Sequence, residues 1–250
     1  MWARRVALLA LPIAASWLVV GAGPAAAATP SGLVLGYGFE RVAADGSIVD
    51  SSPSGLAGHR EGLSLALRAA SVTGHGKALT FASAQQQLVY VGDATALDVD
   101  RFTLAAWVRY QPSVHDDRWE VLEKDGAYWM NIRTDTRKLR VGGFFGGCGS
   151  AGRWVFLDSA AAIPASTWVH VAGTYDGTTL RVYVNGTLSA SRGISGVLCS
   201  NASPLGVGAK INVATGGVEA YFDGRIDDLE VYDRALSAAE IRTVRSTALT

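Results

Sequence analysis

The chain has 250 residues, in which 22 basic residues balance 22 acidic residues, and 49% of the residues are hydrophobic. The lack of a basic excess argues against a nucleic-acid-binding protein, and the apolar fraction is too high for a disordered chain. Only 18% of the residues are charged and 29 are glycine, which favours strands and turns in one large domain over helices with charged surfaces.

The first 28 residues have the pattern of a cleavable signal peptide. Arg4 and Arg5 precede an apolar run over residues 6–20, and the alanines at 26–28 supply the small side chains that a signal peptidase requires. An uncleaved membrane anchor is the alternative, but the run is shorter than the roughly 20 residues that span a bilayer, and a proline interrupts it. We therefore expect cleavage after residue 28, secretion, and no transmembrane span after processing.

The rest of the chain has the hydrophobic pattern of short strands separated by turns. Residues 33–39 alternate, with Leu33, Leu35, Tyr37 and Phe39 on one face. Similar runs follow along the chain without intervening helical periods, which favours a sandwich of two antiparallel sheets over an α/β fold. These further runs lie at 79–81, 87–91, 102–110, 120–124, 128–133, 138–145, 154–157, 168–175, 180–184, 204–207 and 220–232.

Local signals predict two hairpins and one helix. The dipeptides Asp176-Gly177 and Asn185-Gly186 suit tight hairpin turns and predict a three-stranded meander over residues 168–191. Ser237 and Glu240 form a capping box, which predicts a short C-terminal helix. The expected fold is an all-β, two-sheet antiparallel jelly-roll sandwich with one short C-terminal helix, in a single domain over residues 31–250.

Six sequence blocks occur in order along the chain. They are YGF at 37–39, an Asp-Ser-Ser turn that continues to a glycine at 50–55, FTLAAWV at 102–108, WVHVAGTYDG at 168–177, LRVYVNG at 180–186 and FDGRIDDLEVYDRALS at 222–237. Together these blocks resemble the laminin-G-like jelly-roll family of the concanavalin A-like lectin and glucanase superfamily. The resemblance implies two curved antiparallel sheets, and it implies binding of carbohydrate or cell adhesion, often with a calcium ion; it does not by itself imply an enzymatic activity.

The same resemblance implies that Asp50 and Asp227 are calcium ligands. Calcium prefers several carboxylate and carbonyl oxygens, and strand alternation places Asp227 on the buried face with Leu229 and Val231, where an acid needs compensation. The alternative is that Asp50 caps a turn and that Asp227 accepts backbone hydrogen bonds. The family's usual amide after the Asp-Ser-Ser turn is missing in residues 53–58.

The two cysteines, Cys148 and Cys199, both lie in loop sequences. Two cysteines in one exported domain most simply form a disulfide, and no Cys/His cluster suggests a zinc site instead. The predicted disulfide would tie two loops together at one rim of the sandwich and stiffen a candidate ligand-binding edge.

Aromatic residues near these loops suggest a sugar site, because a flat ring stacks on the C–H face of a sugar while polar side chains bind its hydroxyls. Trp154 is the strongest candidate for an exposed position, although a tryptophan in a sandwich is more often part of the core. The candidate ligand-binding residues are Trp154, Phe144, Phe145, Arg153, Asp158 and Asn201. A second set consists of Trp119 and Trp129 with Asp116, Asp117 and Arg118.

Catalysis is disfavoured because no motif places two carboxylates together. Glu120 and Glu123 are three residues apart, so regular alternation would turn them to opposite faces of a strand. The sequence also lacks the motifs of serine hydrolases, zinc proteases and phosphate-binding loops. We expect a secreted, non-catalytic lectin-like module that binds a polysaccharide or a surface glycan, with calcium as a candidate cofactor. The alternative is a cell-surface adhesion module with a protein partner.

Overall fold

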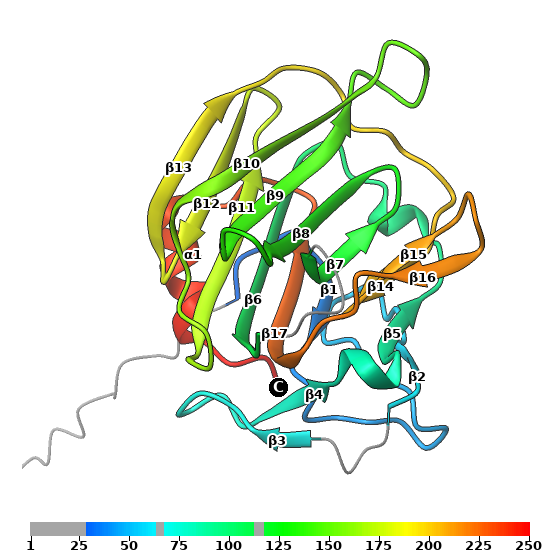
Figure 1. The fold of residues 1–250 in the computed structure, drawn as a ribbon, viewed down its shortest axis with the longest axis vertical. Coiled ribbons are helices and arrows are strands. Elements are labelled where there is room, and N and C mark those ends of the chain that lie inside the picture. Colours follow the sequence, from blue (N-terminus) through cyan, green and yellow to red (C-terminus); the bar gives the residue numbers. More distant parts are fainter. Residues whose placement is uncertain (1–28, 64–67, 113–117) are drawn as a thin grey trace, which may run out of the picture.

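A computed structural model describes residues 29–63, 68–112 and 118–250, so the predicted signal peptide lies outside the described residues. These residues form two antiparallel β-sheets packed face to face and one α-helix near the C-terminus (Figure 1). The predicted all-β, two-sheet sandwich with a short C-terminal helix is therefore confirmed. Among the described residues, no helix is long and apolar enough to cross a membrane.

The first sheet contains eight strands, of which β1 (Leu33–Tyr37) pairs with β17 beside the main path. Its spatial order is β13 (Thr187–Gly193), β12 (Thr179–Val184), β11 (Val169–Tyr175), β6 (Phe102–Tyr110), β17 (Gly224–Tyr232), β4 (Lys77–Phe81) and β3 (Arg68–Ala70). The strands β11, β12 and β13 are the predicted meander. Asn185 and Gly186 both have positive φ angles, 51° and 76°, as the tight turn between β12 and β13 requires.

The second sheet contains seven strands and carries a small separate hairpin next to β7. Its order is β10 (Arg153–Ala162), β9 (Lys138–Phe145), β8 (Tyr128–Arg133), β7 (Arg118–Lys124), β14 (Leu205–Val207), β5 (Leu88–Val91) and β2 (His59–Glu61). The hairpin consists of β15 (Lys210–Asn212) and β16 (Gly217–Glu219), and two short 3₁₀ turns, η2 (Ser83–Gln85) and η3 (Thr95–Leu97), complete the described elements.

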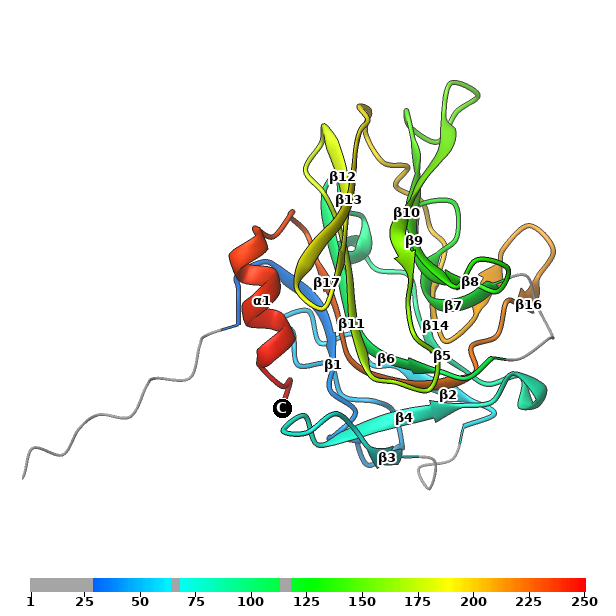
Figure 2. The ribbon, with the colours of Figure 1, turned by 60° about the vertical axis from the view of Figure 1, so that its left-hand side comes forward.

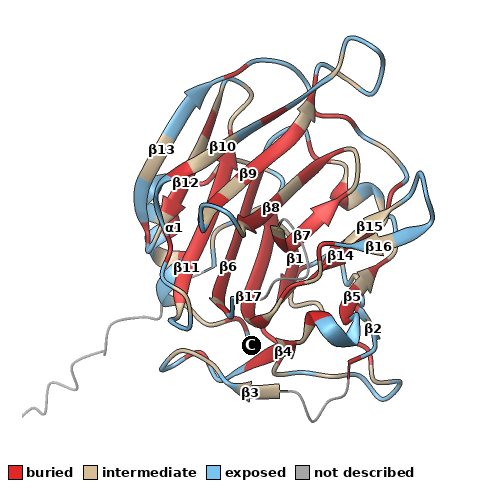
Figure 3. Cartoon of the chain, viewed as in Figure 1, coloured by how far each residue is buried: buried red, intermediate tan, exposed pale blue. Residues whose placement is uncertain are grey.

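The hydrophobic core lies between the two sheets. Figure 3 shows the central strands buried along most of their length, whereas β13 and β16 stay exposed. The first sheet is buried on its outer face as well, because helix α1 (Ala238–Ser246) packs there against Ala105, Ala172 and Tyr232 (Figure 2). The predicted capping box is present, since the Ser237 and Glu240 side chains each accept a hydrogen bond from the other residue's backbone N–H.

A β-bulge in β17 overturns the predicted orientation of Asp227. The register between β17 and β6 shifts between Asp227 and Glu230, so Ile226 and Leu229 both reach the core. Asp227 instead pairs with Trp107, whose indole N–H donates to the Arg245 carbonyl in α1. Asp227 therefore lies on the helix side of the sheet, not on the core face with Leu229, because a bulge breaks regular alternation.

The predicted disulfide between Cys148 and Cys199 is confirmed. Cys148 lies in the loop between β9 and β10, and Cys199 lies between β13 and β14. The backbone of Cys199 also donates to the Phe144 carbonyl at 3.0 Å. The bond therefore ties the end of the β9–β10 hairpin to the segment that enters the second sheet.

Candidate functional site

The outer face of the second sheet carries the polar and aromatic side chains that the core excludes. Strand pairing places Trp129 of β8 opposite both Glu123 of β7 and Gly142 of β9, and Gly142 opposite Phe156 of β10. Paired residues point to the same side of a sheet, so Glu123, Trp129 and Phe156 form one row across four strands. The next row contains Glu120, Asn131, Arg140 and Asp158.

These rows enclose a groove with a volume of about 250 Å³. The Trp129 ring of the groove lies directly against Gly142, since a Cβ atom there would lie 2.4 Å from Cζ2 of Trp129. A larger residue would push the indole out of its place. The groove is lined by Arg118, Glu123, Trp129, Asn131, Arg133, Arg140, Trp154, Phe156 and Lys210.

The β10 side of the groove is aromatic and open to solvent. Trp154 is 51% exposed and Phe156 is 41% exposed, although both are large apolar side chains. The Trp154 ring meets the edges of two neighbours, with centroid distances of 5.0 Å to Trp129 and 4.9 Å to Phe144. Edge-to-face contacts of this kind hold aromatic rings in a defined orientation, so the exposed Trp154 side chain is held in place by its two neighbours.

Arg140 connects the aromatic side to the next row. Its Nε and Nη2 atoms donate to the two carboxylate oxygens of Asp158, at 2.6 and 2.8 Å. The same guanidinium lies 3.8 Å from the centroid of the Phe156 ring. A bidentate ion pair combined with cation–π stacking fixes both the arginine and the phenyl ring beneath it.

The β7 side of the groove is ionic, because a bulge turns two glutamates to the same face. The register between β7 and β8 shifts between Glu120 and Leu122, so Val121 and Leu122 both reach the core. Glu120 and Glu123 then both point outward. The expectation that these two residues face opposite sides is therefore wrong, for the same reason as at Asp227.

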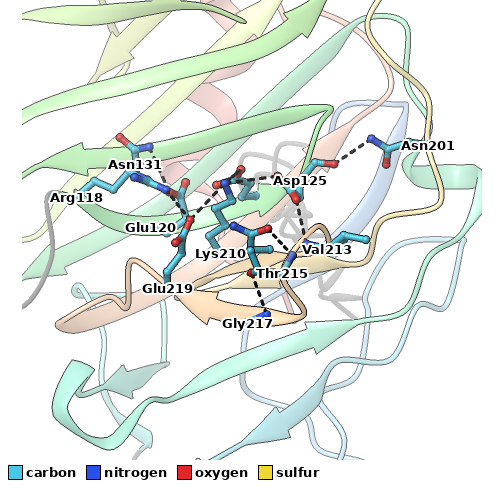
Figure 4. A network of polar contacts seen from close by, with 12 residues as sticks. Arg118, Glu120, Asp125, Asn131, Asn201, Lys210, Val213, Thr215, Gly217 and Glu219 are labelled. Atoms are coloured by element: carbon cyan, nitrogen blue, oxygen red, sulfur yellow. Dashed lines mark hydrogen bonds and ion pairs between the residues drawn. The ribbon is translucent and has the colours of Figure 1, made fainter. Parts of the chain in front are cut away.

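Glu120 lies fully buried beneath its partners (Figure 4). Its Oε2 atom accepts from Arg118 Nε at 3.3 Å and from Asn131 Nδ2 at 3.2 Å. Its other oxygen, Oε1, and the Asn131 oxygen are buried without a hydrogen-bond partner among the described residues. Burial, together with the nearby Glu123 charge, raises the pKa of Glu120 well above its usual value.

Lys210 reaches the same cluster from the β15–β16 hairpin. Its Nζ atom lies 3.7 Å from Glu123, 3.5 Å from Asp125 and 3.4 Å from Glu219, and Glu219 also pairs with Arg118 (Figure 4). Burial raises the pKa of Glu123 to about 7, although Lys210 and Arg118 favour its ionised form. The three acids in turn raise the pKa of Lys210 against the effect of burial, so this lysine stays charged.

Three of the six predicted ligand-binding residues belong to this face. Trp154 lines the groove, Phe144 supports it, and Asp158 holds Arg140. Phe145 does not belong there: it is buried in the core, 4.8 Å from the Tyr175 ring, because it alternates with Phe144.

The other two predicted residues lie away from the groove lining. Arg153 is exposed but alternates with Trp154, so it points to the other side of β10. The Asn201 amide donates to the Asp125 carbonyl at 2.9 Å, and its oxygen accepts from Ser203 N at 3.0 Å. Both contacts shape the loop before β14, which gives Asn201 a local structural role.

The second predicted set is divided by the structure. Trp129 and Arg118 line the groove, whereas Trp119 packs in the core 5.0 Å from the Tyr110 ring. Asp116 and Asp117 lie outside the described residues. The sequence reasoning missed the six other lining residues, which are Glu123, Asn131, Arg133, Arg140, Phe156 and Lys210. Alternation from Trp154 and Trp129 would have indicated Phe156 and Asn131, but no local pattern reveals the β7 bulge or the approach of Lys210.

The two predicted calcium ligands differ in how well they suit a cation. The Asp50 carboxylate already accepts from Gly36 N, Ser52 N, Ser52 Oγ and Leu56 N at 2.6–2.8 Å, which fits a turn cap and not a metal ligand. Asp227 has one oxygen without a hydrogen-bond partner in the described part of the chain. Within that part, no three acidic, histidine or cysteine side chains group closely enough to hold a metal ion, and calcium binding stays a prediction.

Comparison with known families identifies a match over more than half of the chain. A laminin-G family model, described as the concanavalin A-like lectin/glucanases superfamily, matches residues 83–242. This range contains the whole groove lining. No match was found among curated protein sequences.

Solved structures share the fold at low sequence identity. Domain 4 of AbnA, a GH43 extracellular arabinanase from Geobacillus stearothermophilus in complex with arabinotriose, is 20% identical with a TM-score of 0.61, and the match covers 85% of this chain and 98% of that domain. The binding domain of Paraclostridial Mosquitocidal Protein 1 is 16% identical with a TM-score of 0.62, covering 86% of this chain and 52% of that one.

The binding domain of Botulinum Neurotoxin DC in complex with SialylT is 11% identical with a TM-score of 0.57, and the match covers 86% of this chain and 51% of that one. This chain therefore spans about half the length of the two toxin binding domains. These structures share a jelly-roll fold that serves in binding domains.

Proposed function

The chain belongs to the concanavalin A-like lectin/glucanase superfamily, and we propose that it is a secreted, non-catalytic module that binds carbohydrate in the groove of the second sheet. The observation that carries this proposal is the exposed Trp154, held edge-on by Trp129 and Phe144 beside a row of polar side chains. A sugar site needs both aromatic rings and polar side chains, because the C–H face of a sugar stacks on a ring while its hydroxyls require hydrogen bonds.

The size and lining of the groove support a ligand of one or a few sugar rings. Its volume of about 250 Å³ lies just below the roughly 300–1,000 Å³ of pockets that enclose drug-sized ligands. An open groove of this size accommodates a short segment or the end of a glycan, with further residues in solvent. The arabinanase domain in complex with arabinotriose and the neurotoxin domain in complex with SialylT support carbohydrate as the ligand class.

A binding role without hydrolysis agrees with the burial of the glutamates. Glycoside hydrolysis requires two carboxyl groups, one on each side of the scissile bond. Glu120 is completely buried and does not line the groove, so Glu123 has no second carboxyl group of this cluster on the other side of a substrate. The disulfide between Cys148 and Cys199 supports secretion, because such bonds persist in oxidising compartments.

The proposal is tested by a glycan array with the chain lacking residues 1–28 and with its Trp154→Ala variant. We expect the wild-type protein to bind a defined group of glycans and the variant to lose at least tenfold in affinity. Leu188→Ala is the matched control, because Leu188 is also 51% exposed but lies on β13 of the other sheet. Equal glycan binding by Trp154→Ala would show that the groove is not the site. A protein partner without any glycan affinity would favour the adhesion alternative.

A further inference from the structure

The ionic side of the groove is surrounded by more acids than bases. Arg118 and Lys210 are in contact with four carboxylates, those of Glu120, Glu123, Asp125 and Glu219. Arg133 and Arg140, the other cations of the lining, pair with Asp135 and Asp158. An anionic sugar placed against β7 would therefore meet carboxylates beside every cation that attracts it, which disfavours its binding.

Glu123 differs from the other acids of this cluster because neither of its carboxylate oxygens accepts a hydrogen bond from the described residues, whereas Glu120, Asp125 and Glu219 each accept at least one. Its nearest cation, Lys210 Nζ, is 3.7 Å away, which is too long for a hydrogen bond. Within the described residues no hydrogen bond to its carboxylate is present, whereas Glu120 accepts two. Glu123 also lines the groove directly and lies opposite Trp129 in the strand pairing. A carboxylate in this position would face the edge of a sugar ring that stacks on the aromatic side chains.

We propose that Glu123 is the residue that recognises hydroxyl groups in the groove, and that the ligand is a neutral sugar whose hydroxyls donate to the ionised Glu123 carboxylate. This inference rests on the carbohydrate-binding function proposed above. A carboxylate accepts hydrogen bonds on both oxygens, and bonds to a charged acceptor are stronger than neutral ones. Glu120 lies in the neighbouring row, where its carboxylate accepts hydrogen bonds from Arg118 and Asn131 and holds these two lining residues in place.

This role makes binding dependent on pH. The pKa of Glu123 is raised to about 7 by burial, so its ionised fraction rises from about a tenth at pH 6 to about nine tenths at pH 8. If the neutral sugar binds the ionised form, affinity rises by about tenfold over this range. The other groups that face Glu123 are Arg118, Glu120 and Asp125 on and after β7, Lys210 on β15 and Glu219 on β16. Lys210 and Arg118 stay positively charged throughout the range.

The test is calorimetric titration at pH 6, 7 and 8 with three neutral trisaccharides, arabinotriose, xylotriose and cellotriose, and with the acidic trigalacturonate. We expect at least one neutral sugar to bind about tenfold more tightly at pH 8 than at pH 6, and trigalacturonate to bind more weakly than that sugar at pH 8. Glu123→Gln removes the charge with almost no change in shape, so we expect weaker binding at pH 8 and no change with pH.

Glu219→Gln is the matched control, since it removes another carboxylate beside Lys210 and leaves Glu123 in place. Its binding should keep the pH dependence, with the midpoint at a lower pH, because the Glu219 charge contributes to the raised pKa of Glu123. A melting temperature for each variant verifies folding. An independent readout is the carbon-13 shift of the Glu123 carboxyl group, whose pKa should fall by about two units or more when the sugar is bound, because linkage is reciprocal.

The outcomes separate this inference from the proposed function. Neutral-sugar binding that is lost in Trp154→Ala but equal at pH 6 and pH 8 would uphold carbohydrate binding and overturn the role of Glu123. Tighter binding of trigalacturonate, or a tightening toward low pH, would also overturn it. Absence of binding by all four sugars at every pH would contradict the proposed function, and this inference with it.

Discussion

Asp50 and Glu123 show how two partly or fully buried carboxylates come to play different parts in one molecule. Four N–H or O–H donors surround the Asp50 oxygens, and these donors come from β1 and from the turn that follows Asp50. No hydrogen-bond donor of the described chain reaches the Glu123 carboxylate, which instead faces the groove. A carboxylate that is saturated by its own chain stabilises the fold, whereas one that keeps free acceptor capacity is available to a ligand.

The saturation of Asp50 makes its removal costly. In Asp50→Ala the amides of Gly36, Ser52 and Leu56 lose their acceptor, so we expect the free energy of unfolding to fall by about 2–4 kcal/mol. Urea denaturation measures this change. The matched control is Asp45→Ala, because Asp45 accepts only from neighbouring Ser47 in an exposed turn, and its loss should have a small effect.

The same measurement with a chelator addresses the calcium prediction at Asp50. If Asp50 acts as a turn cap, the difference between wild type and Asp50→Ala persists in excess chelator. If calcium binding through Asp50 is the stabilising contact, the chelator lowers the wild-type stability to that of the variant and the difference disappears.

At the scale of elements, bulges mark the limit of what the sequence predicts. Hairpin turns and the helix cap were predictable because they depend on a few adjacent residues with defined backbone preferences, such as Asn185-Gly186 and the Ser237 capping box. Regular alternation predicts the wrong face of the sheet for Glu123 in β7 and for Asp227 in β17, because an extra residue in each strand changes the side to which they point. A bulge depends on the partner strand, which no local pattern contains.

The candidate site was predictable mainly on its aromatic side, and on the ionic side Arg118 was the one lining residue named from the sequence. Trp154 and Phe144 stand out because large apolar residues occur beside glycine-rich loops. The rest of the ionic side depends on the bulge in β7, within the β7–β8 hairpin, and on the approach of Lys210 from the β15–β16 hairpin. The bulge has no local sequence signal, and Lys210 is distant in the sequence from the residues that it contacts.

The disulfide is the covalent link between elements that border the aromatic side. Cys148 and Cys199 are 51 residues apart in sequence, and the chain-entropy relation gives such a cross-link roughly 4 kcal/mol of stabilisation. We expect the double variant Cys148→Ser/Cys199→Ser to lose about 2–4 kcal/mol in urea denaturation. Wild-type protein reduced with a thiol should show the same loss. An unchanged unfolding midpoint in both would mean that the bond does not constrain the unfolded chain as expected.

For the whole molecule, buried acids and a buried histidine set opposite dependences of stability on pH. Burial raises the pKa of Glu123 to about 7 and that of Glu230 to about 8, so the folded protein binds protons that the unfolded chain releases above about pH 4.5. Burial lowers the pKa of His170 to about 3. The contribution of this residue to the free energy of unfolding therefore increases as the pH rises toward about 6.5. Above that pH the histidine is neutral in both states, and only the carboxyl groups act.

We therefore expect Glu123 and Glu230 together to lower the free energy of unfolding by about 2 kcal/mol between about pH 6.5 and pH 8, because over this range the folded state loses protons that the unfolded state no longer holds. Burial raises the pKa of Asp227 to about 8 as well, so this residue adds to the fall. Urea denaturation at several pH values measures the slope. Glu123→Gln and Glu230→Gln should each flatten part of it, whereas a stability that rises with pH would contradict the assignment. In the groove the direction is opposite, since ionised Glu123 is the form proposed to bind sugar. Glu123 would then reduce the stability of the free protein at the pH where binding is tightest. This is expected of a carboxylate whose position serves ligand binding and not the stability of the fold.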